Sequence, residues 1–234
     1  ELGCSPMMFV AAQGMDDCLL TMLSQPGKCG IHKRTSCQQT ALHFAAERGH
    51  CKCVDMLVEH GAMVNVSDDW GVTPLMQAVN SSDANTVRSL LNNGARMNMT
   101  DLRGFNALMY AARKGDADTL AVLLQHGSSV HLPGTKSTPL HQAASFGHLA
   151  CVELLLDAGA PPFLRDIHGI LPIELATQTD QADVVERLLK CERLLQEDKN
   201  AALVSAAKAN ALRCLSMLLK NGANPETWIS GIPT

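Results

Sequence analysis

The residues that begin at Thr138 read TPLHQAASFGH, residues 138–148, and this stretch recurs along the chain. Residues 40–50 read TALHFAAERGH, and residues 73–79 read TPLMQAV, so Thr, Leu and Ala return in the same slots. With the Thr slot as origin, the copies, numbered one to seven, begin at Ser5, Thr40, Thr73, Asn106, Thr138, Leu171 and Ala201. The intervals are 30 to 35 residues. Self-similarity at such a period is the signature of a repeat architecture.

The residue types in these slots predict a pair of helices in each copy. Pro follows the origin in four copies and suits the first turn of a helix, where its missing N–H would be unpaired anyway. The Thr or Ser before it can cap that helix. Glycine nine residues after the origin supplies the left-handed geometry that ends a helix, at Gly14, Gly49, Gly115 and Gly147. A second apolar segment with Leu pairs follows, and residues 68–71 (DDWG) and 101–104 (DLRG) indicate tight turns at hairpin tips.

This pattern resembles the ankyrin repeat, whose signature is T-P-L-H-x-A in a period of about 33 residues. The resemblance implies an all-α fold, an ankyrin-repeat solenoid of about seven helix-turn-helix units with β-hairpin loops. We expect a single domain over residues 1–234, stabilised by stacking of neighbouring copies. The first and last copies should have atypical outer faces, and the copy near Ala201 should be a divergent cap.

The overall composition excludes several classes of protein. The net charge of −4 provides no basic field for a nucleic-acid backbone. The longest apolar stretches, such as residues 152–156, are far shorter than the roughly 20 residues of a membrane span. The part of the chain shown opens with no charged-then-apolar leader, so we expect no secretory signal in it.

Nine cysteines raise the alternatives of disulfides or zinc, but the register argues against both. Four of them share the position 13 residues after an origin, where they should pack as small buried hydrophobes: Cys18, Cys53, Cys151 and Cys214. Free thiols fit a reducing compartment, so we expect an intracellular protein of the cytoplasm, the nucleus or both.

The sequence offers no catalytic constellation. His43 and His141 share a slot in which, by the resemblance, the imidazole ring bonds neighbouring backbone. No nucleophile elbow, phosphate-binding glycine loop or His-Glu-x-x-His pattern occurs. We therefore expect no enzyme activity, no catalytic or metal-binding residues and no cofactor.

The aromatic residues indicate a binding surface. In the ankyrin family, hairpin tips and the outward side of the first helix form a concave groove, and six of the eight aromatics occupy those slots: Phe9, Phe44, Trp70, Phe105, Tyr110 and Phe146. Large, rigid aromatic side chains are favoured at binding hot spots. The alternative is that such residues only fill space between first helices. The expected partner-binding residues are Phe44, Arg48, Trp70, Gln77, Arg103, Phe105, Tyr110, Arg113, Lys114, Gln142 and Phe146.

The functional hypothesis is a non-catalytic protein–protein interaction module, an adaptor or scaffold part of a larger protein that binds a segment of its partner in the concave groove. The partner should be an extended or short helical peptide with apolar anchors and acidic groups, the latter selected by Arg103, Arg113 and Lys114. The stack itself should be monomeric. The alternative is a regulatory or substrate-recruiting arm of a larger enzyme, such as a ubiquitin ligase or a chromatin-modifying enzyme.

Two further hypotheses concern chemistry at single positions. Asn65 and Asn98 occupy the hairpin slot that some ankyrin proteins present to an asparagine hydroxylase, so the resemblance implies both as candidate hydroxylation sites. Trp70, Phe105 and Tyr110 could form an aromatic cage for methyl-lysine, which needs several rings around one cation.

Overall fold

The structure, a computed structural model, describes residues 3–25, 30–132, 136–191 and 194–226. The described residues form helices α1 (Pro6–Ala12), α2 (Asp16–Leu23), α3 (Ala41–Glu47), α4 (Cys51–Glu59), α5 (Pro74–Ser81), α6 (Ala84–Asn92), α7 (Ala107–Lys114), α8 (Ala117–Gln125), α9 (Pro139–Ser145), α10 (Leu149–Asp157), α11 (Pro172–Gln178), α12 (Ala182–Leu189), α13 (Gln196–Lys208) and α14 (Leu212–Lys220). The expected all-α class is confirmed. The loops of the described ranges contain turns but no β-strand.

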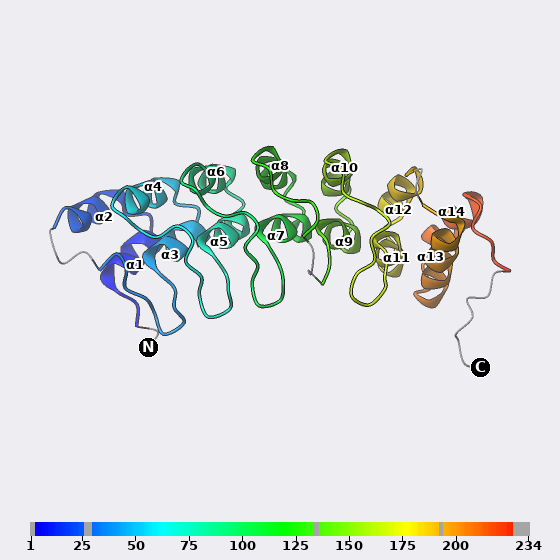
Figure 1. Ribbon diagram of the computed structural model, residues 1–234, viewed down its shortest axis with the longest axis horizontal. Helices are drawn as coiled ribbons and strands as arrows, with labels where there is room; N and C mark the ends of the chain where they lie inside the picture. The colour runs from blue at the N-terminus through cyan, green and yellow to red at the C-terminus, as the bar shows by residue number, and fades with distance from the viewer. Residues whose placement is uncertain (1–2, 26–29, 133–135, 192–193, 227–234) are drawn as a thin grey trace. The chain divides into compact units, whose positions relative to one another are not determined.

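The chain divides into two compact units. Unit 1 comprises Glu1–Ala111 and Asp118–Ser129, and unit 2 comprises Ala112–Ala117 and Val130–Thr234. In unit 1, α3 packs between α1 and α5, while α4 packs between α2 and α6 (Figure 1). In unit 2, α11 packs between α9 and α13, while α12 packs between α10 and α14. Each unit is therefore a layer of first helices beside a layer of second helices.

Six of the seven predicted origins lie immediately before a first helix. The caps follow the sequence: the Thr138 hydroxyl accepts the His141 N–H at 3.4 Å, and the Asn106 side-chain oxygen accepts the Met109 N–H at 2.9 Å. Pro occupies the first turn of α1, α5, α9 and α11, where no intrahelical N–H is lost. Side-chain acceptors thus satisfy N–H groups that the first turn leaves unpaired.

Copy seven departs from this pattern. Helix α13 starts at Gln196, ahead of Ala201, and has 13 residues. The Asp198 carboxylate accepts the Leu195 N–H at 3.1 Å and pairs with Arg165 at 2.8 Å. These contacts stabilise the added turn and attach it to the loop between copies five and six.

The position nine residues after each origin has a left-handed backbone whether or not glycine occupies it. Gly14, Gly49, Gly115 and Gly147 have φ values of +65° to +78°. The copies without glycine there have Ser82, Asp180 and Asn210 at φ values of 56°, 53° and 55°. At Gly115 a side chain is also excluded by space, because a Cβ atom would lie 2.5 Å from the His148 ring. The turn between the two helices therefore imposes the conformation on the residue.

Burial confirms most of the expected core and corrects one detail. Cys53, Cys151 and Cys214 are fully buried, but Cys18 is exposed. The reason is that this position faces the preceding copy, as the 3.2 Å contact from Cys53 Sγ to Asp16 shows, and no described helix precedes copy one.

Candidate functional site

Three loops between copies share one device. In loops 68–72, 101–105 and 166–170, one oxygen of the first residue, an aspartate, accepts the backbone N–H groups two and four residues later. For Asp101 these distances are 2.9 Å to Arg103 and 2.8 Å to Phe105. In each loop the carboxylate therefore closes the turn through backbone N–H groups.

Loops 68–72 and 101–105 lie side by side in unit 1. The Leu102 N–H donates to the Trp70 carbonyl at 2.9 Å. A Cβ atom on Gly71 would lie 3.0 Å from the Asp101 Cα, so the two backbones are as close as a glycine allows.

A pocket of about 430 Å³ lies between these two loops. We call it the loop pocket, and its lining consists of Gln39, Asp68, Trp70, Val72, Gln77, Asp101, Leu102 and Arg103. Its two large apolar side chains project into solvent, since Trp70 is 54% exposed and Leu102 is 75% exposed. Large apolar side chains exposed beside a pocket are typical of surfaces that bind a partner.

Asp101 and Arg103 line the loop pocket, and they form a hydrogen-bonded clasp with Tyr110. The Tyr110 hydroxyl donates to the Asp101 carboxylate at 2.8 Å, and Arg103 donates to that carboxylate at 3.1 Å and to the Tyr110 oxygen at 2.6 Å. Burial raises the pKa of Asp101, but hydrogen bonds from the Phe105 N–H, Tyr110 and Arg103 outweigh it and leave the pKa below its usual value. Burial and the adjacent Asp101 raise the pKa of Tyr110.

Arg103 also occupies the place that a ligand cation would take. Its guanidinium carbon lies 5.3 Å from the Phe105 ring centroid and 5.8 Å from that of Tyr110, and the two rings meet edge to face at 5.9 Å. Within this cluster the protein supplies its own cation to both rings. The arrangement argues against a methyl-lysine cage built from Phe105 and Tyr110.

The opposite wall, loop 68–72, is supported by a buried imidazole. His43 contacts the Thr40 hydroxyl at 3.0 Å through Nδ1 and the Val72 carbonyl at 3.2 Å through Nε2. Burial lowers the pKa of His43 to about 4, so the ring is neutral at physiological pH. His141 bonds the Ile170 carbonyl in the same way at 3.0 Å. The expected structural role of these histidines is confirmed.

Other expected binding residues lie in unit 2. The Arg113 guanidinium lies 5.4 Å from the Phe146 ring, and that ring stacks on His148 at 6.2 Å. Phe146 is 48% exposed, whereas Gln142 is half-buried and donates to Ser137 at 3.1 Å. Lys114 is exposed at the end of α7.

The remaining candidates of unit 1 lie outside the loop pocket. Phe44 is half-buried on α3, and Arg48 is exposed at the end of that helix. The Asn65 side-chain NH2 group donates to the Gly94 carbonyl at 3.0 Å, and the Asn65 side-chain oxygen accepts the Arg96 N–H at 2.7 Å. Asn98 is exposed and accepts the Ser129 N–H at 3.5 Å. Both asparagines thus connect neighbouring copies, and their hydroxylation stays a prediction.

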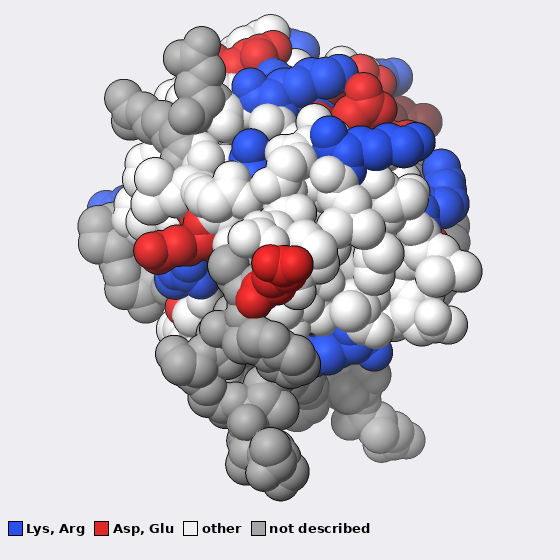
Figure 2. Space-filling view, turned by 90° about the vertical axis from the view of Figure 1, so that its right-hand side faces the viewer, with Lys and Arg blue, Asp and Glu red and all other residues white. Residues whose placement is uncertain are grey.

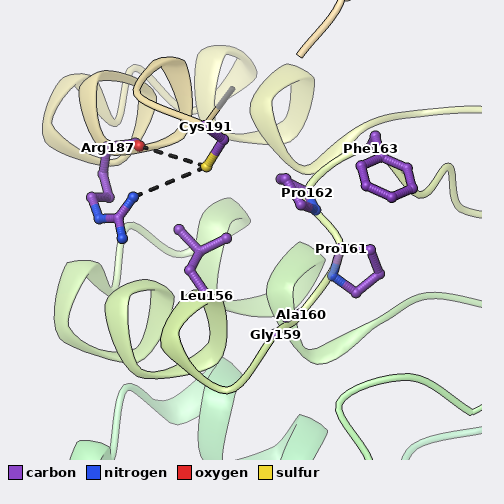
Figure 3. A pocket seen from close by; sticks show the side chains of 8 residues that line it. All are labelled: Leu156, Gly159, Ala160, Pro161, Pro162, Phe163, Arg187 and Cys191. Carbon is purple, nitrogen blue, oxygen red and sulfur yellow. Dashed lines mark hydrogen bonds between the residues drawn. The ribbon is translucent and has the colours of Figure 1, made fainter. Parts of the chain in front are cut away.

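Unit 2 contains a smaller pocket, of about 300 Å³, that the sequence did not suggest. Leu156, Pro161, Pro162, Phe163, Arg187 and Cys191 are among its lining residues (Figure 3). The Cys191 sulfur lies 4.0 Å from Arg187. Burial raises the pKa of Cys191, so the thiol is protonated at neutral pH and is a poor nucleophile.

Sequence reasoning reached part of the loop pocket. It selected Trp70, Gln77 and Arg103, which the structure brings together, and Phe105 and Tyr110, which pack against Arg103. It did not select Leu102 or Gln39. The sequence did contain a usable signal for both residues. Leu102 lies next to Arg103 at a predicted hairpin tip, and Gln39 lies next to Thr40, just before a first helix. The sequence contained no signal for the ion pair between Arg103 and Asp101, because both residue types are equally compatible with a turn in which they do not contact each other.

Two further properties of the described residues bear on other functions. No group of three or more His, Cys, Asp or Glu side chains there is placed to hold a metal ion. Among the helices of those residues, none combines the length and the apolar character that crossing a membrane requires.

Known proteins place this geometry in a family. The family pattern "Ankyrin repeats (3 copies)" matches residues 7–101 and 82–166. Tyrosine-protein kinase Shark of Drosophila melanogaster is 34% identical over 165 residues, which cover 69% of this chain and 14% of that kinase. Transient receptor potential cation channel subfamily A member 1 of Homo sapiens is 34% identical over 93 residues, covering 38% of this chain and 8% of the channel protein.

Among solved structures, the crystal structure of the human ASB11 ankyrin repeat domain matches with a TM-score of 0.79 and 27% identity, covering 95% of this chain and 100% of that one. The chain thus matches a small part of the two longer relatives and the whole of a solved repeat domain. Ankyrin repeats are protein–protein interaction modules. On the family pattern and this likeness, the chain belongs to the ankyrin-repeat family.

Proposed function

We propose that this chain binds an extended or short helical segment of a partner protein at the loop pocket. The observation that supports this most directly is a pocket of about 430 Å³ between two adjoining loops, with Trp70 and Leu102 exposed at its rim. An apolar side chain of the partner would lie between Trp70 and Leu102, where it would remove both from water. The chain would then serve as an adaptor or scaffold part of a larger protein.

The polar residues of the pocket would orient the bound segment. The Gln77 amide can bond peptide backbone, and Arg103 keeps N–H groups beyond the two bonds it makes to Asp101 and Tyr110. Because Asp101 already offsets the charge of Arg103, we expect acidic groups to add less affinity here than the apolar anchor. Any further acidic preference would rest on Arg48, which is exposed at the end of α3.

Selection from a random peptide display library tests this proposal, followed by titration of the selected peptides by calorimetry. Trp70→Ala should weaken binding by about 2 kcal/mol, or roughly 30-fold, as truncation of a hot-spot residue does. Leu102→Ala should weaken binding less, and neither change should lower the thermal midpoint appreciably.

Phe163→Ala is the matched control, because Phe163 is an aromatic side chain with 40% exposure that does not line the loop pocket. It should leave peptide affinity unchanged. Selected peptides that bind the Trp70→Ala, Leu102→Ala double variant as tightly as the unaltered chain would show that the pocket is not the binding site.

A second candidate is the regulatory or substrate-recruiting arm of a larger enzyme. The similarity to tyrosine-protein kinase Shark favours it, because that match covers 69% of this chain within a much longer kinase. The polypeptide encoded on either side of this sequence distinguishes the two candidates, since a catalytic domain there would favour the arm. In either case we propose an intracellular location, because buried free thiols such as Cys53 and Cys214 fit a reducing compartment.

A further inference from the structure

The two aspartates that close the loops of the loop pocket differ in what their second oxygen contacts. In Asp101, one oxygen accepts the two backbone N–H groups of the turn, and the other accepts hydrogen bonds from Arg103 Nε at 3.1 Å and the Tyr110 hydroxyl at 2.8 Å. In Asp68, one oxygen again accepts two backbone N–H groups, but the other accepts only the Gln39 amide, at 3.4 Å. No ion pair between described residues includes Asp68. The described part of the chain therefore does not compensate its charge.

The register of the copies explains this difference. The slot three residues before the origin contains Arg103 in one loop and Trp70 in the other. The slot four residues after the origin contains Tyr110 in one copy and Gln77 in the other. One aspartate therefore has an indole ring in the slot where the other has a guanidinium group, and an amide in the slot where the other has a phenol.

The Asp68 carboxylate is a buried part of the pocket wall, because the residue lines the loop pocket and is only 6% exposed. The described lining contains two carboxylates, Asp68 and Asp101, and one guanidinium, Arg103, so it carries one more negative charge than positive. Arg34 is exposed, donates to the Gln38 side chain at 3.4 Å and is not part of that lining. A buried carboxylate is stabilised by a cation that donates hydrogen bonds to it. The loop pocket therefore suits a positively charged group of a ligand.

We propose that the bound segment carries an arginine, whose guanidinium donates to the second oxygen of Asp68 and lies against the ring of Trp70. This inference rests on the proposed function, since it names the polar residue that accompanies the apolar anchor. The next loop contains the same arrangement within the chain, because Arg103 donates to Asp101 and its guanidinium carbon lies 5.3 Å from the Phe105 ring centroid. The arginine of the partner would repeat this contact one copy earlier.

The groups around the pocket favour arginine over lysine. A guanidinium is planar, stacks on aromatic rings and donates hydrogen bonds in several directions, whereas an ammonium is a compact point charge. The Gln39 amide donates through its NH2 group to Asp68, so its oxygen can accept a second N–H of the same guanidinium. The indole of Trp70 has two faces and is 54% exposed, so it can contact both the arginine and the apolar anchor.

The preference for arginine would be a local property of the pocket rather than an effect of the overall charge. The net charge of the chain is only −4. On the face that Figure 2 shows, lysine and arginine side chains lie beside aspartate and glutamate side chains, so this face provides no field of a single sign. A basic residue elsewhere in the segment should therefore add little affinity, and the spacing between the arginine and the apolar anchor should matter.

A random peptide display library selected against the whole chain provides the probe. The selected peptides should share an arginine at a fixed distance along the sequence from an apolar residue. Citrulline has the shape of arginine without its charge, and its substitution for that arginine should weaken binding by about 30-fold in calorimetric titrations. Lysine at the same position should also weaken binding, because it keeps the charge but not the planar group.

Asp68→Asn tests the other side of the contact. Asparagine keeps a side-chain oxygen for the N–H groups of Trp70 and Val72, so the turn should persist, but the charge is lost. The arginine peptides should bind this variant about 30-fold more weakly, whereas their citrulline forms should bind both chains alike. Asp166→Asn is the matched control, because it makes the same change in an aspartate turn outside the loop pocket, and it should leave both affinities unchanged. Thermal unfolding checks that each variant is folded.

The outcomes separate this inference from the proposed function. Suppose that the selected peptides lose affinity for the Trp70→Ala, Leu102→Ala double variant, as the proposed function requires. The inference is then overturned if these peptides show no enrichment of arginine or favour acidic residues in its place. Equal affinity of the citrulline or lysine forms, or undiminished binding of the arginine peptides to Asp68→Asn, would overturn it as well. Peptides that bind the double variant as tightly as the unaltered chain, or a selection that yields no binder, would overturn the proposed function and this inference with it.

Discussion

The two walls of the loop pocket have the same backbone turn but different supports. Loop 68–72 is supported by the neutral ring of His43, which bonds the Val72 carbonyl. Below loop 101–105 the equivalent slot contains Met76, which has no such donor, and the charged clasp of Asp101, Arg103 and Tyr110 supports that loop instead. The comparison shows that one turn geometry can be secured by a buried neutral group or by an ion pair between a buried aspartate and an exposed arginine. The two walls should therefore respond differently to mutation and to pH.

The largest expected losses of stability are those of the two aspartate variants. Asp101→Ala removes an acceptor from two backbone N–H groups, from Tyr110 and from Arg103, and should lower the free energy of unfolding by about 3 kcal/mol. Asp68→Ala removes the acceptor from two N–H groups and a weaker bond from Gln39, and should cost about 2 kcal/mol. Urea unfolding followed by circular dichroism measures both values. Equal losses would mean that the clasp adds nothing to the turn.

As the pH falls, the stability contributed by His43, which supports loop 68–72, should be lost first. The pKa of His43 in the folded state is about 4, below its usual 6.5, so the native state resists the proton that the unfolded chain accepts. The stability is complete above pH 6.5 and falls as the pH approaches 4, with a loss of about 2 kcal/mol between pH 7 and pH 5. Urea unfolding of the unaltered chain and of His43→Met at pH 7 and pH 5 measures this loss of stability.

Methionine is the natural choice for this comparison because Met76 fills the equivalent slot in copy three. His43→Met should lose stability at pH 7, since the Val72 carbonyl loses its donor, but should remove this part of the pH dependence. If His43→Met lost as much free energy of unfolding between pH 7 and pH 5 as the unaltered chain, His43 would be ruled out as the source of this pH dependence. Loop 101–105 should lose the stability contributed by Asp101 only at lower pH, because the pKa of Asp101 lies below its usual value.

The smallest effect concerns the spacing of the two walls. Gly61 and Gly71 both have left-handed backbones, so Ala at either position should cost about 1 kcal/mol. Gly61 has open space around it, but a Cβ on Gly71 would meet the Asp101 backbone at 3.0 Å. We expect Gly71→Ala to cost about 1 kcal/mol more than Gly61→Ala in thermal unfolding, because backbone must shift to make room. Equal costs would imply that the walls separate freely.

Periodicity in the sequence was sufficient to predict the helices. Pro139 and Thr138 mark a helix start by local chemistry, and Gly147 marks an end, so no tertiary information was needed. The start of α13 was beyond such reasoning, because its added turn depends on the contact between Asp198 and Arg165, residues far apart in sequence. Register alone also could not show that Cys18 is exposed, since exposure depends on which neighbour is present.

The binding surface was partly predictable for a similar reason. The positions of Trp70 and Tyr110 follow from the period, and none of the six selected aromatic side chains is buried. The period does not reveal hydrogen-bond partners, and so Arg103 was assigned to a ligand when the structure pairs it with Asp101. The residues expected to bind a partner remain a prediction that the peptide titrations address.

The aspartate turns have an evolutionary consequence. In loops 68–72 and 101–105 a single carboxylate closes the backbone, while Trp70 and Leu102 project outward and take no part in the fold's own side-chain hydrogen bonds. Under the proposed function, mutations at those two tips would change what the surface recognises at little cost to folding. Partner choice would then be able to change between descendants of this chain while its architecture stays constant.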